Sequence, residues 1–138
     1  MPSKDLYHDK VKNALIKDGW IITHDPLRIQ WGPKDVYVDL GAEQLLAAEK
    51  GKKKIAVEIK SFIGPSEIED LRNAVGQFVL YRAILHQTEP DRGLFLAIRK
   101  AIFHELFEEP IGKLLVESEH IQMIVFDPHK EVIAKWIP

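Results

Sequence analysis

The sequence predicts an α/β domain in which helices flank a central mixed β-sheet. Residues 54–98 contain a strand, a long helix and a second strand, an order that favours parallel neighbouring strands. Residues 36–62 contain two apolar segments joined by a glycine- and lysine-rich connection, which favours an antiparallel hairpin. The 138 residues are 46% hydrophobic and 29% charged, which suits one domain, over residues 1–138, with a buried core.

The first third of the chain is predicted to hold one helix and two short strands. Ser3 is a suitable N-cap for a helix whose apolar side chains recur at helical spacing up to an Asp-Gly pair. Residues 20–23 favour a strand, which the His-Asp-Pro sequence at 24–26 is expected to end as a turn. Residues 29–31 are expected to form the return strand, with Gly32 in the turn that follows.

The hairpin is predicted from an alternating strand and its glycine-containing turn. Residues 36–46 are largely apolar apart from a few residues that include Asp39, and residues 50–53 supply the turn. In the strand that follows, β-branched residues alternate with smaller or charged ones. Glu58 and Lys60 are two residues apart, so both side chains leave the sheet on the same face.

The second half is predicted to alternate between helices and strands. Ser66 followed by Glu69 fits a capping box, and apolar side chains keep helical spacing to about residue 86. Helical structure is expected again over residues 101–119, with an interruption near Pro110. The remaining apolar segments are predicted as strands, at residues 93–98, 121–126 and 132–137.

Composition excludes several classes of protein. Cysteine is absent, so disulfides, thiolate metal sites and cysteine nucleophiles are excluded. The net charge of −2 gives no global attraction to DNA, so binding of DNA would need a local basic patch. The lysines of residues 50–54 could form such a patch, although a solvated turn explains these lysines equally well. The six histidines lack metal-ligand spacing and are expected to be surface or structural residues. Without a membrane span or a signal peptide, the protein is expected to be cytoplasmic.

Asp39, Glu58 and Lys60 form a candidate acidic site. Pairing within the hairpin would bring Asp39 close to Glu58, and Mg²⁺ or Mn²⁺ would relieve the repulsion between the two carboxylates, with the Ile59 backbone carbonyl as a further ligand. Such a cation activates water for attack on phosphorus, while Lys60 would orient that water or offset charge on the phosphate. By itself, a Glu-x-Lys strand also suits the solvated face of an edge strand, where charge prevents aggregation.

Gln77 and Tyr81 add polar groups to the long helix. Their spacing of four residues places both on one face, where they could hydrogen-bond the acidic cluster or a substrate phosphate. The alternative is an exposed helix-forming glutamine beside a peripheral aromatic residue. His8 and Asp9, on the first helix, are further candidates to approach the site from its side.

Together, these motifs resemble those of the PD-(D/E)XK nuclease superfamily. The resemblance rests on Asp39, on Glu58-Ile59-Lys60 and on the Gln77-x-x-x-Tyr81 element, which is similar to one in the RecB-like branch. It implies a restriction-endonuclease-like core and a metal-dependent endonuclease site, with Gln77 and Tyr81 in support. Val38 stands where the superfamily pattern has proline, which weakens the first motif slightly.

A closer resemblance, to the XisH family of fdxN element excision controlling factors, covers nearly the whole chain. It is carried by residues 4–26, 39–71, 76–82 and 125–137. The resemblance implies a role in developmentally regulated, site-specific excision of a DNA element, together with a site-specific recombinase and an XisI-like partner. Two interpretations follow: a Mg²⁺-dependent DNA endonuclease, or a non-catalytic accessory protein that binds DNA, the recombinase or the XisI-like protein. By analogy with other nuclease-fold proteins, a homodimer is also expected.

Overall fold

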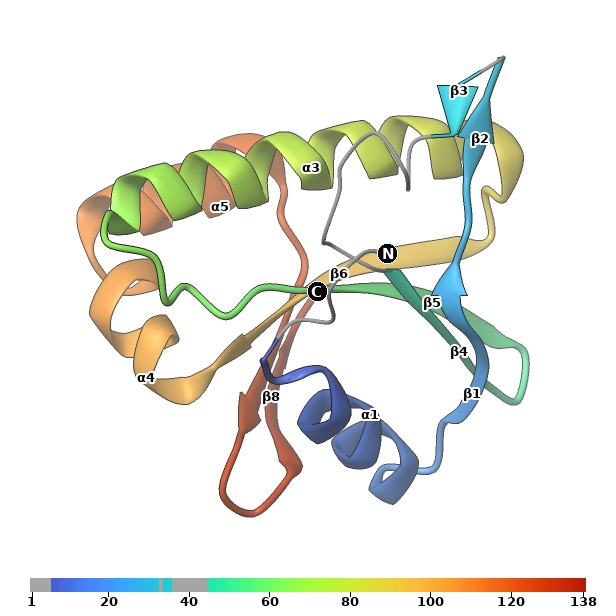
Figure 1. Cartoon of the computed structure of the whole chain (residues 1–138), viewed down its shortest axis with the longest axis horizontal. Helices are drawn as coiled ribbons and strands as arrows, with labels where there is room; N and C mark the ends of the chain where they lie inside the picture. The colour runs from blue at the N-terminus through green and yellow to red at the C-terminus, as the bar shows by residue number, and fades with distance from the viewer. Residues whose placement is uncertain (1–5, 33, 36–44) are drawn as a thin grey trace.

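The computed structural model describes residues 6–32, 34–35 and 45–138. Helices and strands alternate along the chain (Figure 1). The helical segments are α1 (His8–Lys17), α3 (Glu67–Thr88), α4 (Lys100–Ile102), the π-helix η1 (Phe103–Phe107) and α5 (Pro110–Glu119). The strands are β1 (Ile21–Leu27), β2 (Gln30–Trp31), β3 (Lys34–Asp35), β4 (Leu45–Lys50), β5 (Lys53–Ile59), β6 (Arg92–Arg99), β7 (Met123–Asp127) and β8 (Val132–Ile137).

A six-stranded mixed sheet, in the order β1-β4-β5-β6-β7-β8, forms the centre of the protein. β4 pairs antiparallel with β1 and with β5, whereas β5, β6 and β7 run parallel and β8 returns antiparallel to β7. The parallel pairs follow from the chain path, because α3 returns the chain from the end of β5 to the start of β6. The predicted mixed sheet with flanking helices is therefore confirmed.

Helices cover both faces of this sheet. α3 and α5 lie on one face and α1 lies on the other (Figure 1). The core beneath α3 includes Ala56 of β5 and Leu96 of β6, packed with Phe78 and Tyr81 of the helix. The core beneath α1 takes the other apolar residues of β5, namely Ile55, Val57 and Ile59. The predicted alternation in β5 thus separates two apolar cores, as expected for a strand inside a covered sheet.

Two local signals in the sequence correctly predicted where elements begin. At the tip of the β4–β5 hairpin, Lys50 pairs with Lys53, and Gly51 adopts a positive φ of 61°, a conformation favourable to glycine in a tight turn. At the start of α3, the Ser66 hydroxyl accepts a 3.2 Å hydrogen bond from the Glu69 amide. Acidic residues in the first turn of α3 also interact favourably with the helix dipole.

The start of the first helix differs from the prediction. α1 begins at His8, and its N-cap residue is Tyr7, which makes no side-chain capping hydrogen bond. The predicted N-cap, Ser3, lies outside the described residues. None of the helices in the described part of the chain is both long enough and apolar enough to cross a membrane.

The predicted strand break at residues 24–26 is wrong. β1 runs on through these residues, and its pairing with β4 includes His24 with Ala47 and Leu27 with Leu45. Register shifts on either side of His24 absorb the irregular sequence, so the ladder continues despite the proline. The predicted return strand also pairs differently, because β2 joins β3 in a separate two-stranded sheet.

Candidate functional site

Glu58 interrupts an otherwise apolar row of residues that runs across the whole sheet. It pairs with Leu45 of β4 on one side and with Leu96 of β6 on the other. The residues in register, from β1 to β8, are Leu27, Leu45, Glu58, Leu96, Met123 and Ile137. Glu58 is therefore the one ionisable residue in this row of described residues.

Burial makes this position costly for a carboxylate. Only 1% of Glu58 is exposed, and the alternation of β5 places it on the face that α3 covers. The interpretation of Glu58 as a solvated residue of an edge strand is wrong, because β5 lies between β4 and β6. Placing a carboxylate in such a position costs free energy, and charged groups kept there are candidates for function.

Lys60 follows directly after β5 and is half-buried. Its backbone N–H donates a 3.2 Å hydrogen bond to the carbonyl of Ala97, which extends the parallel pairing with β6 by one residue. The position of Lys60 is thereby fixed by the sheet rather than by a loop. The positively charged side chain of Lys60, two residues beyond Glu58, therefore lies where the parallel strands end. This is the edge at which α/β sheets commonly carry binding sites.

Gln77 and Tyr81 lie on α3, above the sheet face that carries Glu58. Tyr81 is 1% exposed and belongs to the core beneath the helix. Gln77 is half-buried, and its buried amide oxygen accepts no hydrogen bond from the described residues. Both side chains thus turn at least partly toward the interior, and the alternative of an exposed glutamine with a peripheral tyrosine is wrong.

The predicted metal site is described only in part. Glu58 and Ile59 are in place on β5, whereas Asp39 lies outside the described residues. Within the described ranges, no group of three or more histidine or acidic side chains could hold a metal ion. The carboxylate of Glu58 and the carbonyl of Ile59 are oxygen donors of the kind that Mg²⁺ prefers, so their chemistry fits a cation that Asp39 would also bind. The roles of these residues remain predictions.

A second polar cluster, which the sequence did not reveal, joins α1 to β1. The Nε2 atom of His8 lies 2.7 Å from one carboxylate oxygen of Asp25, and the Lys12 ammonium donates a 2.9 Å hydrogen bond to the other. His8 is 2% exposed and the Asp25 side chain 14%. His8 therefore holds α1 against the edge strand, and Asp25 is an ion-pair partner rather than a turn residue. The only signal for this cluster was the polar spacing His8-x-x-x-Lys12, which is common on solvated helices.

The ionisation of Asp25 depends on these partners. Burial by itself opposes ionisation, but the hydrogen bond from Lys12, together with the nearby His8, outweighs it and holds the pKa of Asp25 below its ordinary value of 3.8. The same hydrogen bond to Asp25 raises the pKa of Lys12 above its ordinary value of 10.5. The folded protein therefore favours the ionised form of both groups.

Replacing Asp25 by asparagine is expected to lower the free energy of unfolding by about 1–3 kcal/mol at neutral pH, because His8 would lose a charged partner while still buried. Since folding lowers the pKa of Asp25, its contribution is complete above pH 3.8 and is lost as the pH falls through the folded-state pKa. Urea unfolding should therefore show a larger difference in the free energy of unfolding between the unaltered protein and Asp25→Asn at pH 7 than at pH 3. Asp91→Asn, at an exposed aspartate, is the matched control and should change little. An equal loss at both pH values would contradict the assigned ion pair.

Known proteins are similar to this chain over nearly its whole length. The family model described as "XisH protein" matches residues 1–134. A crystal structure of an XisH family protein from Nostoc punctiforme PCC 73102 is 38% identical, with a TM-score of 0.90, over 97% of this chain and 100% of that chain. The crystal structure of an fdxN element excision controlling factor protein from Anabaena variabilis is 41% identical, with a TM-score of 0.88, over 96% of this chain and 98% of that chain. No curated protein matches the sequence.

Proposed function

Because this chain belongs to the XisH family, we propose that it takes part in the site-specific, developmentally regulated excision of a DNA element as a metal-dependent endonuclease-like protein. The role in excision is supported by the similar protein from Anabaena variabilis, which is named an excision controlling factor. The cleavage chemistry is supported by the residues themselves. Its main support is Glu58, an almost fully buried carboxylate in an apolar row of the sheet, with Lys60 two residues further on.

In this proposal, Asp39, Glu58 and the Ile59 carbonyl hold Mg²⁺ or Mn²⁺, whose charge activates water and offsets the charge of a DNA phosphate. Lys60 orients the attacking water or stabilises charge that develops on the phosphate. Gln77 and Tyr81 position these groups from α3. The parallel pairing of β5 with β6 fixes the backbone on which Glu58 is placed, as a precise site requires.

One observation favours a second function, that of a non-catalytic accessory protein. Glu58 is 1% exposed, whereas a phosphodiester must reach any cation that Glu58 holds. The net charge of −2 also makes strong binding of DNA by this chain alone unfavourable. In this alternative, the protein binds DNA, a site-specific recombinase or an XisI-like protein and controls excision by recruitment. A homodimer is compatible with either function and remains a prediction.

Titration of the purified protein with Mg²⁺ or Mn²⁺ in the presence of supercoiled plasmid distinguishes the two functions. The endonuclease proposal expects nicked circles that depend on the metal and disappear in Glu58→Ala, because the variant lacks a predicted ligand. Glu117→Ala, at an exposed glutamate on α5, is the matched control and should nick like the unaltered protein. Absence of nicking, with or without an XisI-like partner, would support the accessory function instead.

A further inference from the structure

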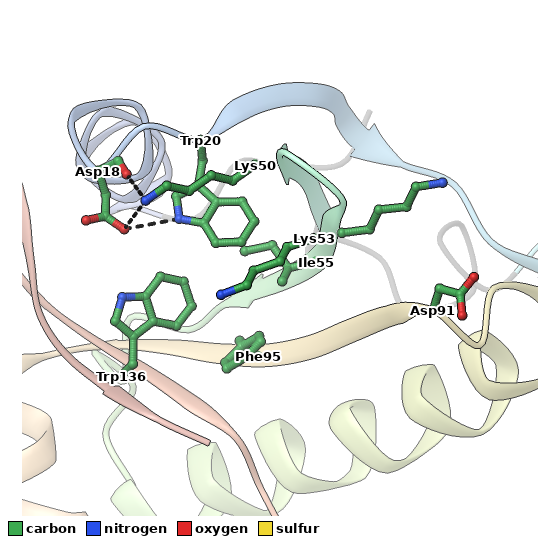
Figure 2. Close-up of a pocket in the computed structure, with 9 residues that line it drawn as sticks. Asp18, Trp20, Lys50, Lys53, Ile55, Asp91, Phe95 and Trp136 are labelled. Atoms are coloured by element: carbon green, nitrogen blue, oxygen red, sulfur yellow. Dashed lines mark hydrogen bonds and ion pairs between the residues drawn. The ribbon is translucent and has the colours of Figure 1, made fainter.

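A pocket of about 540 Å³ lies on the sheet face opposite to Glu58 (Figure 2). It is bounded by the tip of the β4–β5 hairpin, by β6 and β8, and by the residues that follow α1. Its volume falls within the range of about 300–1,000 Å³ that is usual for small-molecule sites. The residues that give it its chemical character are Trp20, Phe95, Trp136, Lys50 and Lys53. Neither the acidic site nor the proposed cleavage uses any of them.

Three aromatic rings form a continuous group in this pocket. The ring centroids of Trp20 and Trp136 are 5.7 Å apart, and those of Phe95 and Trp136 are 5.2 Å apart in an edge-to-face arrangement. Trp20 is almost fully buried and anchors the group in the core beneath α1, whereas Phe95 and Trp136 remain half-buried. Their packing holds the rings in place before any ligand arrives. Partly open aromatic surface of this kind offers a stacking partner to a flat ring.

Charged side chains of both signs line the edge of the same pocket, namely Lys50 and Lys53 with Asp18 and Asp91. Lys50 and Lys53 are direct partners across the hairpin, and like charges in that arrangement repel each other. Lys50 is held by Asp18, because its ammonium group donates a 2.6 Å hydrogen bond to the Asp18 carbonyl. Among the described residues, Lys53 has no ion-pair partner. Figure 2 shows the Lys53 side chain extending across the pocket toward Trp20 and Trp136.

We propose that this pocket binds a nucleotide, with its base against the rings of Phe95 and Trp136 and its phosphate beside Lys53. A flat apolar ring that carries an anionic group matches both halves of the pocket. An inorganic anion would leave the rings unused, and an uncharged aromatic molecule would leave Lys53 without an ion-pair partner among the described residues. The same chemistry is offered by a free nucleotide and by an unpaired nucleotide within a DNA strand.

This site is independent of the proposed cleavage. Side chains that alternate along β5 point to opposite faces, so the pocket and Glu58 are separated by the sheet itself. Binding in the pocket needs no metal and can be measured in the presence of a chelator. Failure of this proposal therefore leaves the nicking experiment untouched, and loss of nicking activity leaves this proposal untouched.

Tryptophan fluorescence provides a direct test, because Trp20 and Trp136 lie in the pocket. The third tryptophan, Trp31, is 55% exposed on β2, and Trp31→Phe removes its background. In this variant with EDTA present, deoxyadenosine monophosphate is expected to quench the fluorescence in a saturable way. Deoxyadenosine and inorganic phosphate should each bind at least about tenfold more weakly, because each lacks one half of the recognised group. No saturable change with the nucleotide, or equal binding of phosphate alone, would overturn the proposal.

A short single-stranded oligonucleotide and a duplex of the same length distinguish the two sources of the nucleotide. Tighter binding of the single strand than of the mononucleotide or the duplex would identify the ligand as an unpaired nucleotide of DNA. Tighter binding of the mononucleotide would identify a free nucleotide. Binding of the duplex alone, or of an acidic peptide as tightly as any nucleotide, would contradict the stacking that the proposal requires.

Two substitutions test the assigned contacts. Lys53→Glu should weaken nucleotide binding at least about tenfold because it replaces an attractive charge with a repulsive one. Its folding stability should be unchanged or higher, because Lys50 gains an oppositely charged neighbour across the hairpin. Lys113→Glu, at an exposed lysine on α5, is the matched control and should bind normally. Phe95→Leu keeps an apolar side chain at a half-buried position and should weaken the nucleotide but not phosphate. Unchanged nucleotide binding in both pocket variants would place the ligand elsewhere.

Discussion

Replacement of Lys60 by alanine is expected to reduce metal-dependent nicking of DNA by about 100-fold or more. Lys60 is held at the end of β5 by the backbone hydrogen bond to Ala97, two residues beyond Glu58. A fixed positive charge stabilises developing charge without the reorganisation that water would need, so its loss affects the transition state most strongly. The measurement is the initial rate of plasmid nicking at saturating Mn²⁺, with Lys113→Ala as the control lysine.

This variant also separates catalysis from metal binding. Lys60 is not a predicted ligand, so Lys60→Ala should retain most of the affinity for Mn²⁺, whereas Glu58→Ala should lose both affinity and nicking. Calorimetric titration with Mn²⁺ measures the affinity for the metal independently of nicking. Nicking that persists in Lys60→Ala would show that the cleavage site lies elsewhere. Loss of nicking together with loss of the folded state would instead assign Lys60 a structural role.

Replacement of Gly112 by alanine is expected to destabilise the protein by about 3 kcal/mol. Gly112 is buried in α5, and an added Cβ would lie 2.2 Å from the carbonyl oxygen of Leu106 and 2.6 Å from the Cα of Phe107. Both are backbone atoms at η1, so the conflict cannot be relieved by a change of rotamer. The higher helix propensity of alanine, worth about 1 kcal/mol, is too small to compensate.

Gly76→Ala is the matched control for this substitution. Gly76 is an exposed residue in the middle of α3, and within 4 Å an added Cβ would meet no atom of the described residues beyond the backbone of its own helix and its chain neighbours. Alanine should therefore stabilise the protein there by about 0.5–1 kcal/mol, through helix propensity alone. Urea unfolding should move the two midpoints in opposite directions. Equal stability of the two variants would contradict the close approach of α5 to η1.

The two faces of the sheet give the protein two separate chemistries to test. The face beneath α3 carries Glu58 of β5, and Lys60 follows the end of β5. The opposite face carries the pocket formed by Trp136, Phe95 and Lys53. The strand β5 contributes residues to both sites. If both sites function, a nucleotide in the pocket and a phosphodiester at the acidic site would therefore bind on opposite faces of this strand. Nicking of a plasmid by Lys53→Glu, compared with the unaltered protein, measures whether the pocket assists cleavage.

Local signals in the sequence determined many of the elements. The alternation in β5, the glycine turn before it and the Ser66 cap of α3 each depend on residues a few positions apart, and each was predicted correctly. The break near Pro110 was correct for the same reason, because proline limits the backbone of its immediate neighbours. The order of helices and strands then led to a mixed sheet with helices on both faces. The candidate residues Glu58 and Lys60 also came from spacing along one strand.

Only the tertiary structure decided how these elements meet. The spacing of residues along β5 does not indicate whether the strand lies inside the sheet or at its edge. A solvated edge was therefore an alternative for Glu58 in the sequence. The pairing of β5 with β4 and β6 decides the question, because it places Glu58 in an apolar row inside the sheet. Likewise, the pairing of His8 with Asp25 and the grouping of Trp20 with Trp136 join residues far apart in the sequence. Such contacts depend on which strands are neighbours and in which register, and a local pattern of side chains contains neither. The sequence thus determined the elements and their chemistry, and long-range packing determined which groups are buried together.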